Sequence, residues 1–136
     1  MARNVLVDAG FLVALLSRRD SHHPWAVAQA SNHALPWRTC EAVLSEALHL
    51  LGTRGLPALG AMLRRRALLA IFDLDNDLDP VLKLLHKYAN LPMSLADACL
   101  VRMSETIADP IVLTTDSDFR IYRRHSRQVI PCSLPS

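Results

Sequence analysis

The sequence has few cysteines, glycines and aromatic residues. Its three cysteines, among 136 residues, form no Cys-x-x-Cys unit, which argues against a disulfide framework and a zinc knuckle. The four glycines form no phosphate-binding loop, and no two of the six histidines are spaced i, i+4 as in helical zinc motifs. No apolar run approaches the ~20 residues that a bilayer requires, so we expect no membrane segment.

The composition is that of a globular chain. Hydrophobic residues make up 51% of the sequence, which excludes disorder, and the length suits one domain over residues 1–136. The start, Met1-Ala2-Arg3-Asn4, continues directly into a strand-like segment, so we expect no signal peptide and a cytoplasmic location. The 15 basic residues nearly balance the 13 acidic ones, and this net charge of +2 identifies no partner.

Short apolar runs alternate with helical patterns along the whole chain. Strands are expected at 4–7, 35–39, 67–74, 111–113 and 129–130. Helices are expected at 11–17, 24–32, 41–51, 56–66, 80–88, 94–108 and 118–124. Because the strands are almost entirely apolar, both faces of the sheet should be covered. The pattern predicts an α/β fold, a three-layer α/β/α sandwich around a central, mostly parallel sheet.

Two aspartates follow apolar strands. Asp8 comes directly after the first strand, and Asp116 follows the strand at 111–113. Ligands of open parallel sheets bind outside the carboxyl ends of the strands, so both side chains should reach one crevice. The alternative for each is a helix N-cap, in which the carboxylate accepts a hydrogen bond from a free backbone N–H.

Two further acids lie on expected helices. Asp97 projects from a mainly apolar face, where an unpaired carboxylate is costly. The alternative for Asp97 is a capping box with Ser94, and both roles can hold together. Glu46 lies at the edge of the apolar face of the helix 41–51, and its alternative is a solvated boundary position.

These four carboxylates are informative as a group. If they converge, each pair about 4 Å apart repels by about 4 kcal/mol at an effective dielectric constant of about 20. Bound cations or protonation make such a cluster tolerable. Carboxylates without histidine or cysteine suit Mg²⁺ or Mn²⁺, ions that orient phosphodiester oxygens and activate water. The residues therefore point to metal-assisted phosphodiester hydrolysis.

Several segments resemble one known family. The segments at 5–10, 42–48, 92–98 and 113–119 read Val-Leu-Val-Asp-Ala-Gly, Ala-Val-Leu-Ser-Glu-Ala-Leu, Pro-Met-Ser-Leu-Ala-Asp-Ala and Leu-Thr-Thr-Asp-Ser-Asp-Phe. In this order and spacing the chain resembles the PIN-domain ribonucleases, particularly the VapC-like toxins of toxin–antitoxin pairs. The resemblance implies that a metal-binding quartet consists of Asp8, Glu46, Asp97 and Asp116.

The same resemblance implies accessory residues and two departures. Thr114 matches a position for a supporting hydroxyl, and Asp118 matches an accessory acid. Ala9-Gly10 replaces the Thr or Ser that often follows the first aspartate, and Ser94 stands where many relatives carry another aspartate. The Ser94 departure removes an extra carboxylate and weakens the case for a second metal ion.

The resemblance also implies a function. It indicates an Mg²⁺- or Mn²⁺-dependent endoribonuclease with an RNA substrate, acting as a homodimeric toxin that a cognate antitoxin protein neutralises. The alternative is a catalytically weak PIN-like module that binds protein or RNA.

Arginines make up 13 of the 15 basic residues, and a group of them follows Asp116. Arg120, Arg123, Arg124 and Arg127 could contact RNA phosphates, or could simply form a solvated helix and turn. With the proposed quartet set aside, 15 basic residues face nine acids, a net charge of +6. We therefore expect an acidic centre within an arginine-rich surface.

Overall fold

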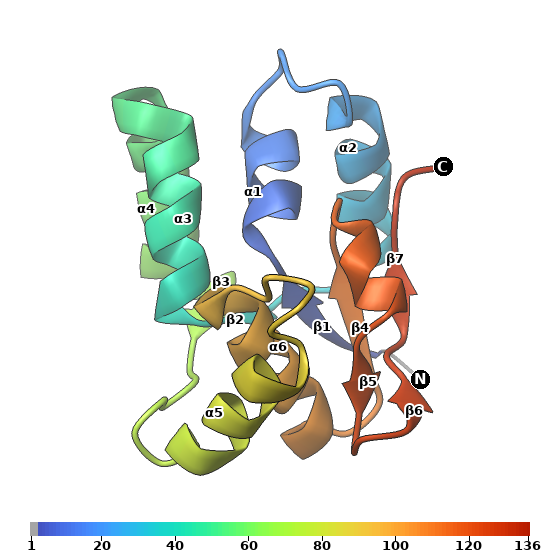
Figure 1. The fold of residues 1–136 in the computed structure, drawn as a ribbon. Coiled ribbons are helices and arrows are strands. Elements are labelled where there is room, and N and C mark those ends of the chain that lie inside the picture. The colour runs from blue at the N-terminus through green and yellow to red at the C-terminus, as the bar shows by residue number, and fades with distance from the viewer. Residues whose placement is uncertain (1–2) are drawn as a thin grey trace.

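The computed structural model describes residues 3–136, which form a five-stranded parallel sheet with the strand order β3-β2-β1-β4-β7 (Figure 1). These strands are β1 (Asn4–Val7), β2 (Trp37–Thr39), β3 (Leu68–Ala70), β4 (Pro110–Leu113) and β7 (Cys132–Ser133). The central strands β1 and β4 are almost fully buried, as their apolar sequences predict. Met1 and Ala2, on which the expectation about the start of the chain partly rests, lie outside the described residues.

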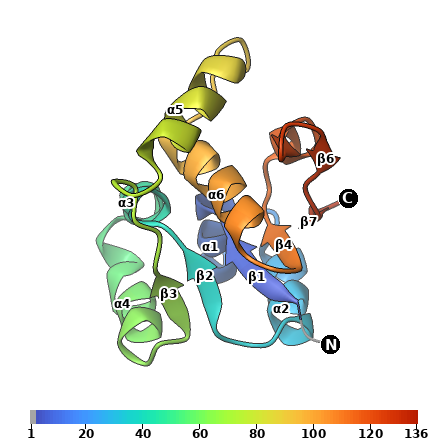
Figure 2. The same ribbon diagram turned by 90° about the horizontal axis from the view of Figure 1, so that it is seen from below.

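Helices cover both faces of the sheet. The helices α1 to α4 lie on one side, and α5 and α6 cross the other (Figures 1 and 2). Their bounds are α1 (Ala9–Leu16), α2 (His23–Asn32), α3 (Glu41–Leu51), α4 (Leu56–Arg64), α5 (Leu78–Lys87) and α6 (Leu95–Thr106). Two 3-10 helices, η1 (Gly52–Arg54) and η2 (Ser117–Arg120), extend the connections. The expected three-layer α/β/α sandwich is confirmed.

Each helical segment that faces the sheet buries its apolar positions. Phe11 and Leu12 of α1 are fully buried, and Phe11 packs edge-on against Trp37 of β2 with ring centroids 5.5 Å apart. In α6, Leu100 and Val101 are also fully buried. Within residues 3–136, no helix combines the length and the apolar character that a membrane crossing requires.

Two adjacent strands place the start of the site. Strands β1 and β4 pair in parallel, and Val7 lies opposite Leu113. The residues that follow these two positions, Asp8 and Thr114, therefore leave the sheet side by side at its carboxyl edge.

The segment after Asp116 differs from the expected helix at 118–124. Only η2 is helical there, and the chain continues into a hairpin of β5 (Arg123–Arg124) and β6 (Gln128–Val129). His125 and Ser126 both have positive φ, which turns the hairpin without the Asn-Gly pair that usually signals such a turn. The strand expected near 129–130 is thus β6, outside the main sheet, and β7 is the last strand of that sheet.

The strand expected at 67–74 is shorter than its apolar run. Only β3 pairs, because its partner β2 offers three residues, from Trp37 opposite Leu68 to Thr39 opposite Ala70. The length of a strand thus depends on the neighbour as well as on its own sequence.

Candidate active site

Asp8 connects strand β1 to helix α1. Its backbone N–H donates to the carbonyl of Leu113 at 3.2 Å, which continues the ladder between β1 and β4. Its Oδ1 accepts from the backbone N–H of Phe11 at 2.9 Å, so Asp8 is the N-cap of α1. The N-cap alternative is confirmed, and the same side chain, only 6% exposed, stands at the carboxyl edge of the sheet.

Thr114 joins two of the predicted acids. This buried side chain donates its hydroxyl hydrogen to Oδ2 of Asp8. Its Oγ1 also accepts from the backbone N–H of Asp116 at 2.9 Å. Asp116 in turn caps η2, because its Oδ1 accepts from the backbone N–H of Asp118 at 2.9 Å. One hydroxyl therefore sets the positions of Asp8 and Asp116 relative to each other.

Asp97 lies in the first turn of α6. The Oγ of Ser94 accepts from the backbone N–H of Asp97 at 3.0 Å, and Oδ2 of Asp97 accepts from the backbone N–H of Ser94 at 3.3 Å. This is the capping box expected from the sequence. Ser94 thus acts as a helix cap.

Tyr122 contacts Asp97 and was missed by the sequence reasoning. Its hydroxyl donates to Oδ2 of Asp97 at 3.2 Å, although its ring is fully buried. The ring packs edge-on against Phe119 and Tyr88, with centroids 5.3 and 5.1 Å away. No local pattern signals this bond, since Tyr122 follows Asp97 by 25 residues and reaches it only through the tertiary fold.

Glu46 lies on α3 with an exposed side chain, as the boundary alternative expected. It nevertheless lines the same pocket as the other three acids. This pocket, of about 150 Å³, is lined by Asp8, Ala9, Gly10, Glu46, Leu50, Ala96, Asp97, Thr115 and Asp116. The structure therefore brings together the four acids that the sequence singled out. Asp118, Ser94 and Thr114 are not part of the lining.

Gly10 shapes one wall of this acid pocket. A Cβ atom at this position would lie 2.1 Å from Oγ1 of Thr115, closer than real atoms approach. Glycine thus lets the loop after β4 come close to the first turn of α1. At position 10, the hydroxyl of Thr115 occupies the space that a side chain would take.

The environment of the acid pocket disfavours the ionised form of its own carboxyl groups. Burial raises the pKa of Asp8 to about 7, against the lowering effect of its bonds from Thr114 and Phe11. The charges of Asp97 and Asp116 raise the pKa of Asp8 further. Burial also raises the pKa of Asp97, and the charge of Asp116 contributes. The carboxylates are thus close enough to repel one another.

One model of a known domain family matches most of the chain. The model of the PIN domain matches residues 5–124. The chain belongs to the PIN domain family. PIN domains are generally metal-dependent nucleases, so the chain is assigned to a superfamily that acts on nucleic acids with divalent cations. A comparison with curated proteins finds no match.

The donors of this PIN domain fit a hard divalent cation by type, because the titratable groups lining the acid pocket are all carboxylates. Within residues 3–136, however, no group of three His, Cys, Asp or Glu side chains is arranged to hold a metal ion as it stands. Both oxygens of Asp8 accept hydrogen bonds, while the bonds of the described residues leave Oδ1 of Asp97 and Oδ2 of Asp116 unengaged. Each carboxylate oxygen has two lone pairs, so these bonds leave room for a cation as well.

The four arginines after Asp116 differ in their contacts. Arg123 donates to the backbone carbonyls of Arg120, Ile121 and Tyr122, at 2.7 to 3.1 Å. Arg124 donates to the carbonyl of Ser104 at 2.5 Å. Arg120 and Arg127 are exposed. None of the four lines the acid pocket of the PIN domain.

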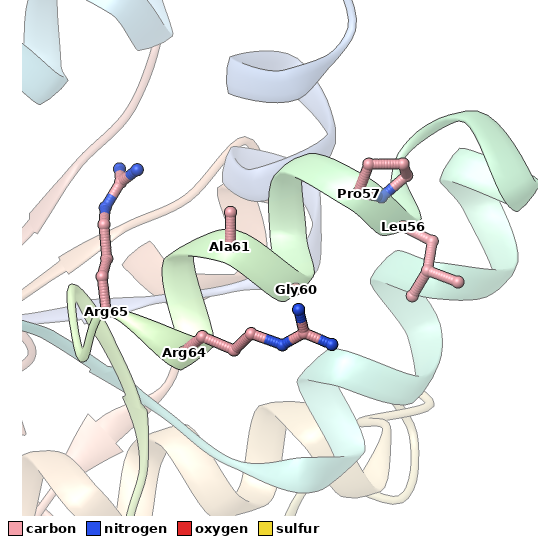
Figure 3. Close-up of a pocket in the computed structure, with 6 residues that line it drawn as sticks. All are labelled: Leu56, Pro57, Gly60, Ala61, Arg64 and Arg65. Carbon is pink, nitrogen blue, oxygen red and sulfur yellow. The ribbon is translucent and has the colours of Figure 1, made fainter.

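A larger hollow lies away from these acids. It measures about 780 Å³ and is formed by α4, with Leu56, Pro57, Gly60, Ala61, Arg64 and Arg65 as its lining (Figure 3). It contains no carboxylate, and its two arginines point in different directions (Figure 3). Its size does not make it the active site, because it brings no reactive groups together.

Proposed function

We propose that this PIN domain is an Mg²⁺- or Mn²⁺-dependent endoribonuclease that hydrolyses RNA phosphodiester bonds. One observation carries the proposal: Asp8, Glu46, Asp97 and Asp116, drawn from four separate segments, line one pocket at the carboxyl edge of the sheet. Like charges are gathered there at a cost in free energy, as expected where a cation is to be bound.

Each residue has a proposed role. Asp8, Asp97 and Asp116 are the core metal ligands, and Glu46 is a ligand, directly or through water, that orients the attacking water. A bound Mg²⁺ or Mn²⁺ supplies positive charge that neutralises the scissile phosphate and acidifies that water. In the reaction the water gives up a proton to solvent as its oxygen bonds to phosphorus, the bond to the leaving oxygen breaks, and the leaving oxygen takes up a proton from solvent.

The accessory residues hold these ligands. Thr114 orients Asp8 through its hydroxyl and Asp116 through its Oγ1. Ser94 fixes the first turn of α6, and with it Asp97. Asp118 supports Asp116 through its backbone N–H. Arg120, Arg123, Arg124 and Arg127 are proposed to contact RNA outside the acid pocket, with the freely exposed Arg120 and Arg127 best placed to do so.

The biological setting is proposed from the resemblance of the motifs to VapC-like toxins. The protein would be the cytoplasmic toxin of a toxin–antitoxin pair, a homodimer that its cognate antitoxin protein neutralises. Expression of the chain alone should then arrest growth. Co-expression of a small DNA-binding protein encoded by a neighbouring reading frame should relieve the arrest.

A second candidate function is a catalytically weak PIN-like module that binds protein or RNA. It is favoured by the lack, within residues 3–136, of a ready-made metal-binding group, and by serine at position 94. Such a module would bind RNA or protein tightly and would not hydrolyse RNA.

A cleavage assay separates the two candidates. A mixed RNA pool and single-stranded DNA are incubated with wild type, Asp8→Asn, Asp97→Asn and the control Asp75→Asn, in Mg²⁺, in Mn²⁺ and in EDTA. Asp75 is an exposed aspartate outside the acid pocket, so its variant makes the same chemical change elsewhere.

We expect divalent-dependent RNA cleavage by wild type and Asp75→Asn. Asp8→Asn and Asp97→Asn should lose at least about 100-fold in rate, because each removes a ligand for the ion that stabilises the transition state. Cleavage that persists in both site variants or in EDTA would contradict the proposal. Binding of RNA without any cleavage would favour the binding module.

A further inference from the structure

A second pocket adjoins the acid pocket. It measures about 270 Å³, and its lining includes Arg18, Arg19 and Arg54. Leu50 lines both pockets, so they share a wall. No acidic residue lines this second pocket, which we call the arginine pocket. The arginine pocket, which is lined by positive charges, thus lies next to the acid pocket, which is lined by carboxylates.

The helices α1 and α3 carry both pockets. They lie side by side and contact each other (Figure 1). Asp8 precedes the first residue of α1, and Arg18 follows its C-cap, Ser17, at the far end of a helix about 12 Å long. On α3 and its extension η1, Glu46, Leu50 and Arg54 follow one another at intervals of four residues. The two helices therefore define a track with carboxylates toward one end and arginines toward the other.

The charges of the arginine pocket are not neutralised by the protein. Arg18, Arg19 and Arg54 are exposed, and none forms an ion pair within residues 3–136. The carboxyl ends of α1 and α3 both face this region, and each contributes roughly −0.5 of an elementary charge. These partial charges weaken the positive potential of the three arginines but do not cancel it.

Backbone hydrogen bonds order the segment that bears Arg18 and Arg19. At its start, the N–H of Ser17 donates to the carbonyl of Val13 at 2.9 Å, and the N–H of Asp20 donates to the carbonyl of Ser17 at 3.1 Å. Beyond it, the side chain of His23 bonds to the carbonyl of Ala14 at 2.8 Å. An ordered segment loses less conformational entropy when it binds a ligand.

Two glycines place Arg54 at the end of α3. Gly52 has a φ of 67°, in the left-handed region that favours glycine, and it turns the chain from α3 into η1. A Cβ atom on Gly55 would lie 2.5 Å from Cβ of Leu51, so the turn closes tightly only with glycine there. After this tight turn, Arg54 lines the arginine pocket together with Leu50 and Leu51 of α3.

We propose that the arginine pocket binds backbone phosphates of the nucleic-acid substrate that flank the phosphate at the acid pocket. The inference rests on the proposed function for the identity of the substrate. An acidic pocket repels a polyanion, so neighbouring phosphates need positive charge within reach, and guanidinium groups bind phosphate through paired hydrogen bonds. The shared wall at Leu50 and the track along α1 and α3 place that charge where a strand leaving the acid pocket passes.

Binding measured without catalysis tests this proposal. Fluorescence anisotropy of a labelled single-stranded RNA is recorded in EDTA over a range of salt concentrations for wild type, Arg18→Gln, Arg54→Gln and Arg64→Gln. Arg64 is the matched control, because it is exposed and lies on α4 outside both pockets. The metal-dependent KM and kcat of the same variants are measured in parallel.

We expect Arg18→Gln and Arg54→Gln each to weaken binding by about 5- to 10-fold at low salt, and to reduce the slope of log Kd against log salt by about 0.7. KM should rise with little change in kcat, since the flanking phosphates do not react. Arg64→Gln should behave as wild type.

Two outcomes overturn the proposal. If Arg18→Gln and Arg54→Gln bind RNA with the same affinity and the same salt slope as wild type, the arginine pocket serves another ligand, such as an acidic protein surface. An equal loss in Arg64→Gln would show that only diffuse surface charge acts. If instead RNA binds through Arg18 and Arg54 but is never cleaved in Mg²⁺ or Mn²⁺, the proposed nuclease activity fails while the phosphate site stands.

Discussion

Asp8 combines a structural role with a place in the proposed metal site. Its Oδ1 caps α1, and its Oδ2 accepts the hydroxyl of Thr114. The cap alternative and the site hypothesis were therefore not exclusive. The same holds for Asp97, whose carboxylate closes a capping box with Ser94 while lining the acid pocket. Capping orients both side chains before any ion binds.

The pKa of Asp8 predicts how pH affects the metal-free protein. In the folded state the pKa of Asp8 is about 7, against 3.8 for an ordinary aspartate, so the folded protein binds this proton more tightly than the unfolded chain does. The resulting stabilisation is complete below about pH 4 and is lost as the pH rises through about 7. Urea unfolding in EDTA should therefore show a free energy of unfolding that falls between these pH values.

Asp8→Asn provides the control for that prediction. An amide does not titrate, so the fall with pH should shrink to the part contributed by Asp97, whose pKa is also raised. Added Mg²⁺ should raise the Tm of the wild type more at pH 8 than at pH 5, because ion and proton compete for the same carboxylates. Identical pH profiles for wild type and Asp8→Asn would contradict this account.

At the scale of elements, the end of α3 separates the acid pocket from the arginine pocket. Gly52 ends this helix with a positive φ, and a Cβ atom there would meet no other atom within 4 Å. Gly52 combines φ 67° with ψ −164°, a region that is essentially confined to glycine, so Gly52→Ala should destabilise the protein by about 1–3 kcal/mol through backbone strain alone. Gly60 lies inside α4, where a Cβ atom also has open space.

Gly60→Ala is thus the matched variant, and we expect it to change the free energy of unfolding in the opposite direction. It should stabilise the protein by about 0.5–1 kcal/mol, because alanine is the better helix former and restricts the unfolded chain. Urea denaturation of both variants measures the difference. If Gly52→Ala proves neutral, backbone strain does not explain the glycine at this position.

At the scale of the whole molecule, charge is segregated. The net charge is only +2, but the acid pocket collects four of the 13 acids, and the arginine pocket beside it collects three of the 13 arginines. Outside the acid pocket, all 15 basic residues and the other nine acidic residues give a net charge of +6. Without metal, the acid pocket should therefore oppose the binding of a polyanion.

This segregation predicts that removing acids strengthens binding while it abolishes cleavage. In EDTA at low salt and at pH 8, where Asp8 with its pKa of about 7 is mostly ionised, Asp8→Asn combined with Asp116→Asn should bind single-stranded RNA about 3-fold more tightly than wild type, because repulsion acts within a Debye length of about 10 Å at 0.1 M salt. Asp75→Asn combined with Asp79→Asn makes the same change of net charge outside the acid pocket. Equal gains in both pairs would show that net charge alone, and not its placement, controls binding.

Much of the fold could be predicted because its signals are local. The apolar strands β1 and β4, the long helices α3 and α6, and the Ser94–Asp97 capping box all follow from spacing within a few residues. The hairpin of β5 and β6 could not be predicted in this way. Its turn uses positive φ at His125 and Ser126, and its first strand, Arg123–Arg124, carries no strand pattern.

The sequence by itself determined the order of the strands and α-helices from β1 to β4, the caps and the four acids, because each is encoded by neighbouring residues and by the periodicity of helix and strand. Only the tertiary structure decided what lies beside those acids. The hydroxyl of Tyr122 on Asp97, the fit of Thr115 against Gly10 and the placement of Arg18 next to Arg54 all join distant segments. Such contacts depend on strand register and helix packing, which short-range patterns do not specify.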